Sequence, residues 1–150
     1  MYNHKKGGLN AMFKKILLAS DGSNNSLRAC DRAIEIAKFK VDSIIEIVYV
    51  TDLNTSKQEA LHHMDADVIQ LEREQRMQLT VEKIKAAGVN SITTILHGEP
   101  GPTIVKYAND QDFDLVVIGS RGLNSLQEMV LGSVSHKVAK RVQCPVMIVK

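Results

Sequence analysis

The chain has 150 residues, of which 44% are hydrophobic and 24% are charged, and its net charge is +2. These values are typical of a single globular domain with one core. The 19 basic and 17 acidic residues are spread along the chain, which argues against a nucleic-acid-binding face. No apolar run approaches the ~20 residues of a membrane span and no secretory signal is evident, so we expect a cytoplasmic protein without a membrane partner.

Five short apolar segments are predicted to be strands, because each is too short for a helix and several stop at a turn signal. The segments are KKILLAS from residue 14, SIIEIVYV at 43–50, SITTILHG at 91–98, DLVVIG at 114–119 and PVMIVK at 145–150. Before them, residues 1–12 carry no periodicity and are expected to be a flexible extension of a domain at 13–150.

Helical patterns alternate with these strands. The first begins near Ser26, the second covers about 65–87, the third opens at Pro102 and Thr103, and the last covers 133–142. Strict alternation of strands and helices predicts a single doubly wound α/β domain with a parallel sheet. The apolar face of the first helix is predicted to be Leu27, Cys30, Ala33, Ile34 and Ala37, and that of the second Val68, Leu71, Gln75, Leu79 and Ile84.

Two cysteines, Cys30 and Cys144, are far apart and belong to no CxxC pair. We expect both thiols to be reduced, the first as a small buried side chain and the second near a helix end. The spacing of cysteines, histidines and carboxylates predicts no metal site.

Glycines and hydroxyls follow the fourth predicted strand. Gly119 and Gly122 allow the backbone to approach a ligand, and Gly132 precedes Ser133, a suitable N-cap for the last helix. The free N–H groups of a helix start bind anions, and Ser133 and Ser135 could donate hydroxyl protons to phosphate oxygens. The glycines taken alone are equally compatible with ordinary turns.

The loop after the first strand contains Asp21. Its carboxylate could accept hydrogen bonds from a ribose hydroxyl or an adenine amine, or it could fix the turn that leads into the next helix. Both roles are compatible. Ligands of doubly wound sheets bind beyond the carboxyl ends of the strands, where the strand order reverses.

The spacing Gly119-xx-Gly122, nine residues, then Gly132-Ser133 resembles the nucleotide-binding signature of the universal stress protein family, in its ATP-binding branch. The resemblance includes the opening KKILLASDGS, the central HGEP, DLVVIGSRG and the closing CPVMIVK. The better-known phosphate loops GxxxxGK[ST] and GxGxxG do not occur.

The resemblance implies a five-stranded parallel sheet of order 3-2-1-4-5, a bound ATP with or without Mg²⁺, and a homodimer formed through Val146–Val149. It also implies the residues that contact the nucleotide. These are Ala19, Asp21 and Val50 on the adenosine side, Ile118 and Gly119 beside them, and Gly122, Gly132, Ser133, Val134 and Ser135 at the ribose and phosphates.

We therefore expect an ATP-binding regulatory protein of the stress response with little or no catalysis. One alternative is a slow ATPase or other nucleotide-hydrolysing enzyme, for which only Arg121 and Asp21 are candidate groups. A second alternative is a dimeric adaptor that binds no nucleotide.

Overall fold

The computed structural model describes residues 13–52, 66–121 and 131–150. The expected extension at 1–12 and the predicted phosphate-loop glycine Gly122 lie outside these residues.

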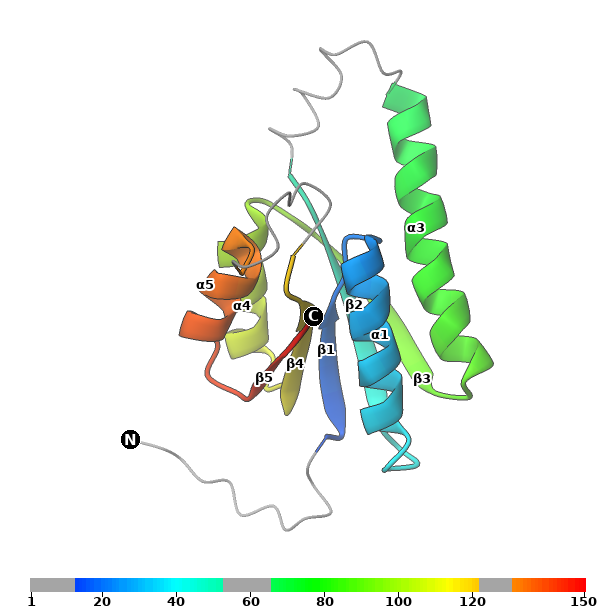
Figure 1. The fold of residues 1–150 in the computed structure, drawn as a ribbon, viewed down its shortest axis with the longest axis vertical. Helices are drawn as coiled ribbons and strands as arrows, with labels where there is room; N and C mark the ends of the chain where they lie inside the picture. The colour runs from blue at the N-terminus through cyan, green and yellow to red at the C-terminus, as the bar shows by residue number, and fades with distance from the viewer. Residues whose placement is uncertain (1–12, 53–65, 122–130) are drawn as a thin grey trace.

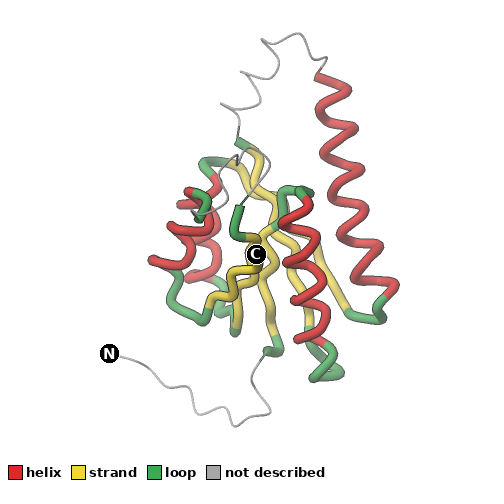
Figure 2. The backbone as a smooth tube through the Cα atoms, in the orientation of Figure 1, coloured by secondary structure: helices red, strands yellow, loops and turns green. Residues whose placement is uncertain are grey.

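The described residues form one parallel sheet with helices on both faces, as predicted (Figures 1 and 2). The sheet has the order β3-β2-β1-β4-β5, which confirms the order expected from the family resemblance. The strands are β1 (Lys15–Ala19), β2 (Ile44–Thr51), β3 (Asn90–His97), β4 (Leu115–Gly119) and β5 (Val146–Val149). The helices are α1 (Asn24–Ala37), α3 (Ala66–Ala86), α4 (Pro100–Asp110) and α5 (Ser133–Arg141).

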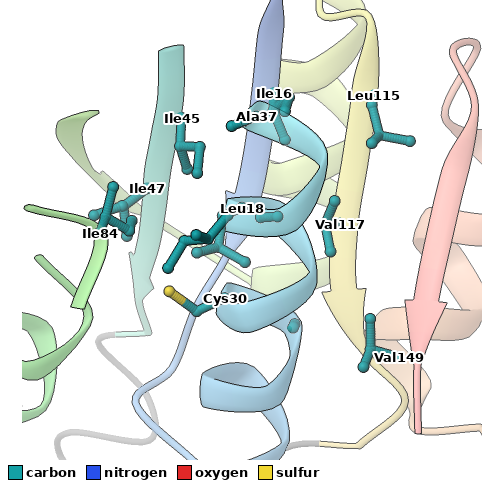
Figure 3. Packing of buried hydrophobic residues seen from close by; sticks show 13 residues of the cluster. Ile16, Leu18, Cys30, Ala37, Ile45, Ile47, Ile84, Leu115, Val117 and Val149 are labelled. Carbon is teal, nitrogen blue, oxygen red and sulfur yellow. The ribbon is translucent and has the colours of Figure 1, made fainter. Parts of the chain in front are cut away.

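Alternate residues of β1, β2 and β4 enter two separate cores, because successive side chains of a strand point to opposite faces. Helices α1 and α3 cover one face, whose core is drawn in Figure 3, and α4 and α5 cover the other. In β1, for example, Ile16 and Leu18 pack towards α1, whereas Leu17 and Ala19 pack towards α4 and α5. Burial on both faces explains why β1 and β4 are almost continuously apolar.

Helix α4 begins at Pro100, two residues before the predicted start at Pro102, and Glu99 is its N-cap. Proline suits the first helical position, because it has no N–H to leave unpaired and its φ is already helical. The Gly101 that follows is buried against α5, so this first turn is part of the helix packing rather than a loop.

The predicted apolar face of α3 is wrong over most of its length. Val68, Leu71 and Leu79 are 45%, 54% and 54% exposed, whereas Thr80 and Ile84 are completely buried. The buried residues are four apart and therefore share one side of the helix. A threonine does not contribute to an apolar pattern, so the pattern followed the exposed leucines instead and predicted the wrong side of the helix.

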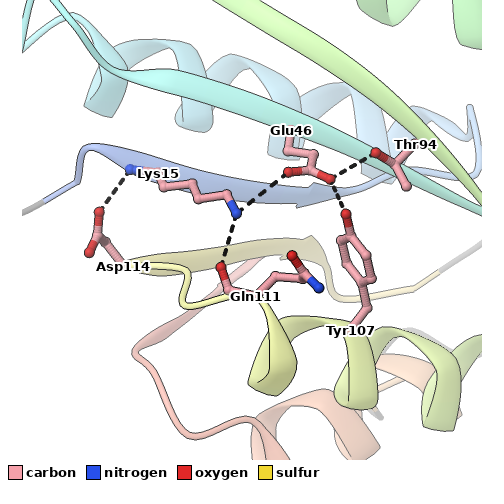
Figure 4. A network of polar contacts seen from close by, with 6 residues as sticks. All are labelled: Lys15, Glu46, Thr94, Tyr107, Gln111 and Asp114. Carbon is pink, nitrogen blue, oxygen red and sulfur yellow. Dashed lines mark hydrogen bonds and ion pairs between the residues drawn. The ribbon is translucent and has the colours of Figure 1, made fainter.

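A buried carboxylate, Glu46, organises polar contacts on the α4 face of the sheet (Figure 4). Thr94 of β3 donates to its Oε1 at 2.8 Å, and the Tyr107 hydroxyl of α4 donates to the same oxygen. Lys15 Nζ lies 3.9 Å from its Oε2 and donates to the carbonyl of Gln111. Burial, then the hydrogen bond to Glu46, raises the pKa of the Tyr107 phenol, which keeps it a donor.

Replacing Ile84 by alanine tests this packing of α3. Ile84→Ala removes a completely buried side chain and is expected to lower the free energy of unfolding by about 2–5 kcal/mol. Leu79→Ala, in the same helix, is the control and should change it by no more than about 0.5 kcal/mol. Urea denaturation measures both, and equal losses would mean that the Leu79 side of α3 is packed as well.

Candidate functional site

The strand order reverses between β1 and β4, and the carboxyl ends of these two strands are neighbours. Ala19 of β1 lies opposite Ile118 of β4 in the parallel register. After β1 the chain continues to β2 and β3 on one side, and after β4 it continues to β5 on the other. The two loops singled out in the sequence therefore start side by side, at the position where ligands of this fold class bind.

The first loop is a tightly bonded turn into α1. Ser20 N–H donates to the carbonyl of Val48 at 3.0 Å, which holds the loop against β2. The carboxylate of Asp21 accepts from Ser23 N–H at 2.9 Å, and Ser23 in turn caps α1 by accepting from Ser26 N–H. The turn-forming role of Asp21 is thus confirmed, and a contact of Asp21 with ligand stays a prediction.

The second loop is closed at its base by Ser120. Ser120 N–H donates to the carbonyl of Val149 in β5 at 2.8 Å. The Ser120 carbonyl accepts from Gly132 N–H at 2.8 Å and from the Ser135 hydroxyl at 2.8 Å. Ser120 therefore joins the end of β4 to β5 and to the start of α5, and it brings Gly132 back to the strand end.

Helix α5 presents backbone donors at this base. Its N-cap is Gly132 rather than the predicted Ser133, and its first internal bond runs from His136 N–H to the carbonyl of Gly132. The N–H groups of Ser133, Val134 and Ser135 precede that bond, so they have no acceptor within the helix. Three donors and the positive end of the helix dipole are therefore available to an anion.

The two predicted hydroxyl donors are in different situations. Ser133 is exposed at the first helical position, where its hydroxyl can meet solvent or a ligand. Ser135 is 2% exposed, and its hydroxyl lies 2.8 Å from the Ser120 carbonyl and 2.9 Å from the Gly132 carbonyl. Because its single proton is directed at these carbonyls, Ser135 supports the base of the loop and has only its backbone N–H to offer.

Gly119 is required by a close approach of α1 to β4. A Cβ at this position would lie 2.9 Å from the backbone carbon and oxygen of Asn25, which real side chains do not tolerate. A Cβ on Gly132 would meet the Ser120 carbonyl oxygen at 3.3 Å, a milder contact. The first glycine therefore has a packing role, which the sequence did not reveal because Asn25 is distant from it in the chain.

Four of the predicted contact residues lie on the α4 and α5 face of the sheet. Ala19 and Ile118 are 5% and 6% exposed and belong to its core. Val50 and Val134 are only partly buried against the same core. Of these four, Val50 and Val134 thus retain the exposed apolar surface that an adenine ring could cover.

Other reactive groups lie away from these loops or are unsuited to catalysis. Burial raises the pKa of the Cys30 thiol to about 11, which disfavours the nucleophilic thiolate, and Cys144 is also a free thiol. The described ranges contain no cluster of three or more histidine, cysteine, aspartate or glutamate side chains that could bind a metal. Nor does any helix in those ranges combine the length and apolarity needed to cross a bilayer.

Sequence reasoning missed Ser120, whose backbone organises the site. The one signal in the sequence is its place directly after a buried strand, between the two glycines of GSRG. Backbone groups rather than its side chain do the bonding, so residue type alone could not have identified it.

Comparison with known proteins agrees with this architecture. A sequence model described as the universal stress protein family matches residues 12–150. The universal stress protein YxiE of Bacillus subtilis is 38% identical over 148 residues, covering 93% of this chain and 100% of its own. The solved structure of MJ0577 from Methanocaldococcus jannaschii has a TM-score of 0.79 at 29% identity, covering 93% and 96%. A universal stress protein solved in complex with cAMP has a TM-score of 0.68 at 27% identity, covering 93% and 98%.

Alanine at the two glycines should have graded effects on stability. Gly119→Ala forces α1 away from β4 and is expected to cost about 1–3 kcal/mol. Gly132→Ala keeps an allowed backbone conformation with φ of −59° and should cost less than about 1 kcal/mol. Thermal and urea unfolding of both variants give the order, and a larger loss at Gly132 would contradict the packing role of Gly119.

Proposed function

We propose that this chain, which belongs to the universal stress protein family, is a regulatory protein that binds ATP between its two carboxyl-edge loops. The observation that carries the proposal is the set of three backbone donors at the start of α5, which Ser120 holds at the end of β4, the neighbour of β1 in the sheet. The phosphates would accept from Ser133, Val134 and Ser135, and Asp21 would accept from the adenosine. Gly122, outside the described residues, would contribute backbone to the same site.

The complex of a 27% identical universal stress protein with cAMP supports an adenine nucleotide as the ligand. Val50 and Val134 supply the partly exposed apolar surface for the base, on the same face of the sheet. Mg²⁺ would enter with the phosphates rather than through a carboxylate cage of the protein. We propose a cytoplasmic location, which suits two free thiols.

Binding without efficient turnover is the form of the proposal that the side chains favour. Phosphoryl transfer needs a positioned base or water, a metal clamp and a cationic stabiliser. At the described ends of the two loops the candidate groups are Asp21 and Arg121, and one carboxylate oxygen of Asp21 already accepts from Ser23 N–H. These two groups alone do not make up the base, metal clamp and cationic stabiliser that catalysis needs.

The site can be tested by calorimetric titration of the wild-type chain and of two Asp21 variants. Each is titrated with ATP, ADP and AMP, with and without Mg²⁺. Asp21→Asn keeps an oxygen that can accept from Ser23 N–H but loses the second carboxylate acceptor. We expect it to keep this turn-forming bond and to bind ATP about tenfold more weakly. Asp21→Ala should lose both affinity and part of its stability.

The outcomes separate the alternatives. ATP binding near one per chain without phosphate release would support the regulatory function, and phosphate release at steady state would favour a slow ATPase. Wild-type affinity in both variants would remove Asp21 from the site. Failure of the wild-type chain to bind any of the three nucleotides would favour the nucleotide-free adaptor.

We also propose a homodimer through β5. Val116 N–H donates to the carbonyl of Pro145, and Ser120 N–H donates to the carbonyl of Val149. Alternate residues along β5, starting from Pro145, therefore direct their backbone polar groups towards β4. The N–H and carbonyl groups of Val146 and Ile148 therefore point to the open edge of the sheet, where a second copy could pair with them.

A charge on this edge should separate the copies. Met147 is 37% exposed on β5, and Met147→Lys is expected to shift the dimer to a monomer. Ile95→Lys is the matched control, because Ile95 is 51% exposed on β3 at the opposite edge. Light scattering after size exclusion measures both masses. Wild-type protein that is already monomeric, or a dimer that only Ile95→Lys disrupts, would contradict pairing through β5.

A further inference from the structure

An ion pair joins the middle of α5 to the N-terminus of α4. The Nζ atom of Lys137 in α5 is 2.7 Å from Oε1 of Glu99, the N-cap residue of α4. The aliphatic part of the lysine lies over Gly101, where an added Cβ would be 2.7 Å from Lys137 Cδ. Close packing thus directs the ammonium group to the first turn of α4.

Glu99 has an unusual role for an N-cap residue. Its side chain makes no hydrogen bond to the N–H groups of its own helix. Two of the first three residues of α4 are prolines, Pro100 and Pro102, which have no N–H to offer. The carboxylate is instead the partner of Lys137, so it neutralises a cation that belongs to the neighbouring helix.

Lys137 also lies about one helical turn from the first residue of α5. It follows Ser133 by four residues, so both side chains lie on the same side of α5. Side chains in a helix incline towards its N-terminus, which brings the lysine stem towards the N–H groups of the first turn. The N-termini of α4 and α5 lie at the same end of the domain, beyond the carboxyl ends of the strands (Figure 1).

The pair is held loosely enough to exchange. The Lys137 and Glu99 side chains are 39% and 63% exposed, and exposed ion pairs contribute little to stability. A phosphate chain carries more charge than one carboxylate and would lie in the field of the helix dipole as well. An anion at the start of α5 can therefore compete with Glu99 for the ammonium group.

We propose that Lys137 binds the distal phosphates of a polyphosphate nucleotide, and that Glu99 is the internal anion that the phosphates displace. The pair would set the preference of the site for a di- or triphosphate over a monophosphate. The inference rests on the proposed nucleotide site but is separate from it, because a monophosphate would bind without Lys137.

Calorimetry at low salt with ATP, AMP and inorganic tripolyphosphate tests the pair. Glu99→Gln frees the ammonium group and is expected to tighten ATP and tripolyphosphate binding about three- to tenfold. Lys137→Met keeps the aliphatic cover over Gly101 and should weaken both by a similar factor. AMP affinity should change less than about twofold in either variant.

The double variant and a control complete the experiment. In the Lys137→Met background, Glu99→Gln should no longer tighten ATP binding, since the two residues act through one contact. Lys106→Met is the control, because Lys106 pairs with Asp110 on α4 in a similar exposed ion pair. It should leave all three affinities unchanged.

Several results would overturn the inference, and they can be told apart. If the variants changed the affinities for ATP and AMP equally, or if Glu99→Gln left the ATP affinity unchanged, the ion pair would be only a surface contact. The proposed nucleotide site would still stand in that case, provided that AMP binds. Failure of the wild-type chain to bind either AMP or ATP would reject the nucleotide site. If Glu99→Gln then bound no tripolyphosphate either, the role of Lys137 would be rejected with it.

Discussion

The hydrogen bonds of Ser120 are the constraint on which the rest of the site depends. Its N–H is bonded to β5 through Val149, and its carbonyl is bonded to Gly132 and Ser135 at the start of α5. These bonds close the long loop at its base and fix the direction of the helix relative to the sheet. These bonds thereby position the first three N–H groups of α5 at the end of β4.

Packing on both faces of the sheet holds this base in place. Because Gly119 has no side chain, the backbone of Asn25 in α1 can pack closely against β4. On the opposite face, the buried Val138 packs α5 against the sheet. The buried Glu46 adds polar contacts that join three strands to α4. The described ends of the two loops are therefore supported by the packing of the sheet and its helices.

Continuous apolar strands separated by helical periodicity predicted the strand and helix order, and the signature resemblance predicted the sheet order. The failures have local physical causes. The buried side of α3 includes Thr80, which no apolar pattern marks, whereas its exposed leucines suggested the wrong side. Nor could the sequence show that the Ser135 hydroxyl bonds carbonyls of its own fold, and the contact of Ser135 with a nucleotide stays a prediction. Side-chain direction and long-range contacts such as that of Gly119 with Asn25 depend on tertiary structure.

The most direct test of the account is the amide spectrum of ¹⁵N-labelled protein titrated with ATP and, separately, with adenosine. The account predicts that ATP shifts the amide resonances of Ser133, Val134 and Ser135, and that adenosine, which lacks phosphates, shifts them much less. Resonances near Asp21 should respond to both ligands. Shifts confined to another surface, or an unchanged first turn of α5 at saturating ATP, would contradict the claim that these backbone donors bind the phosphates.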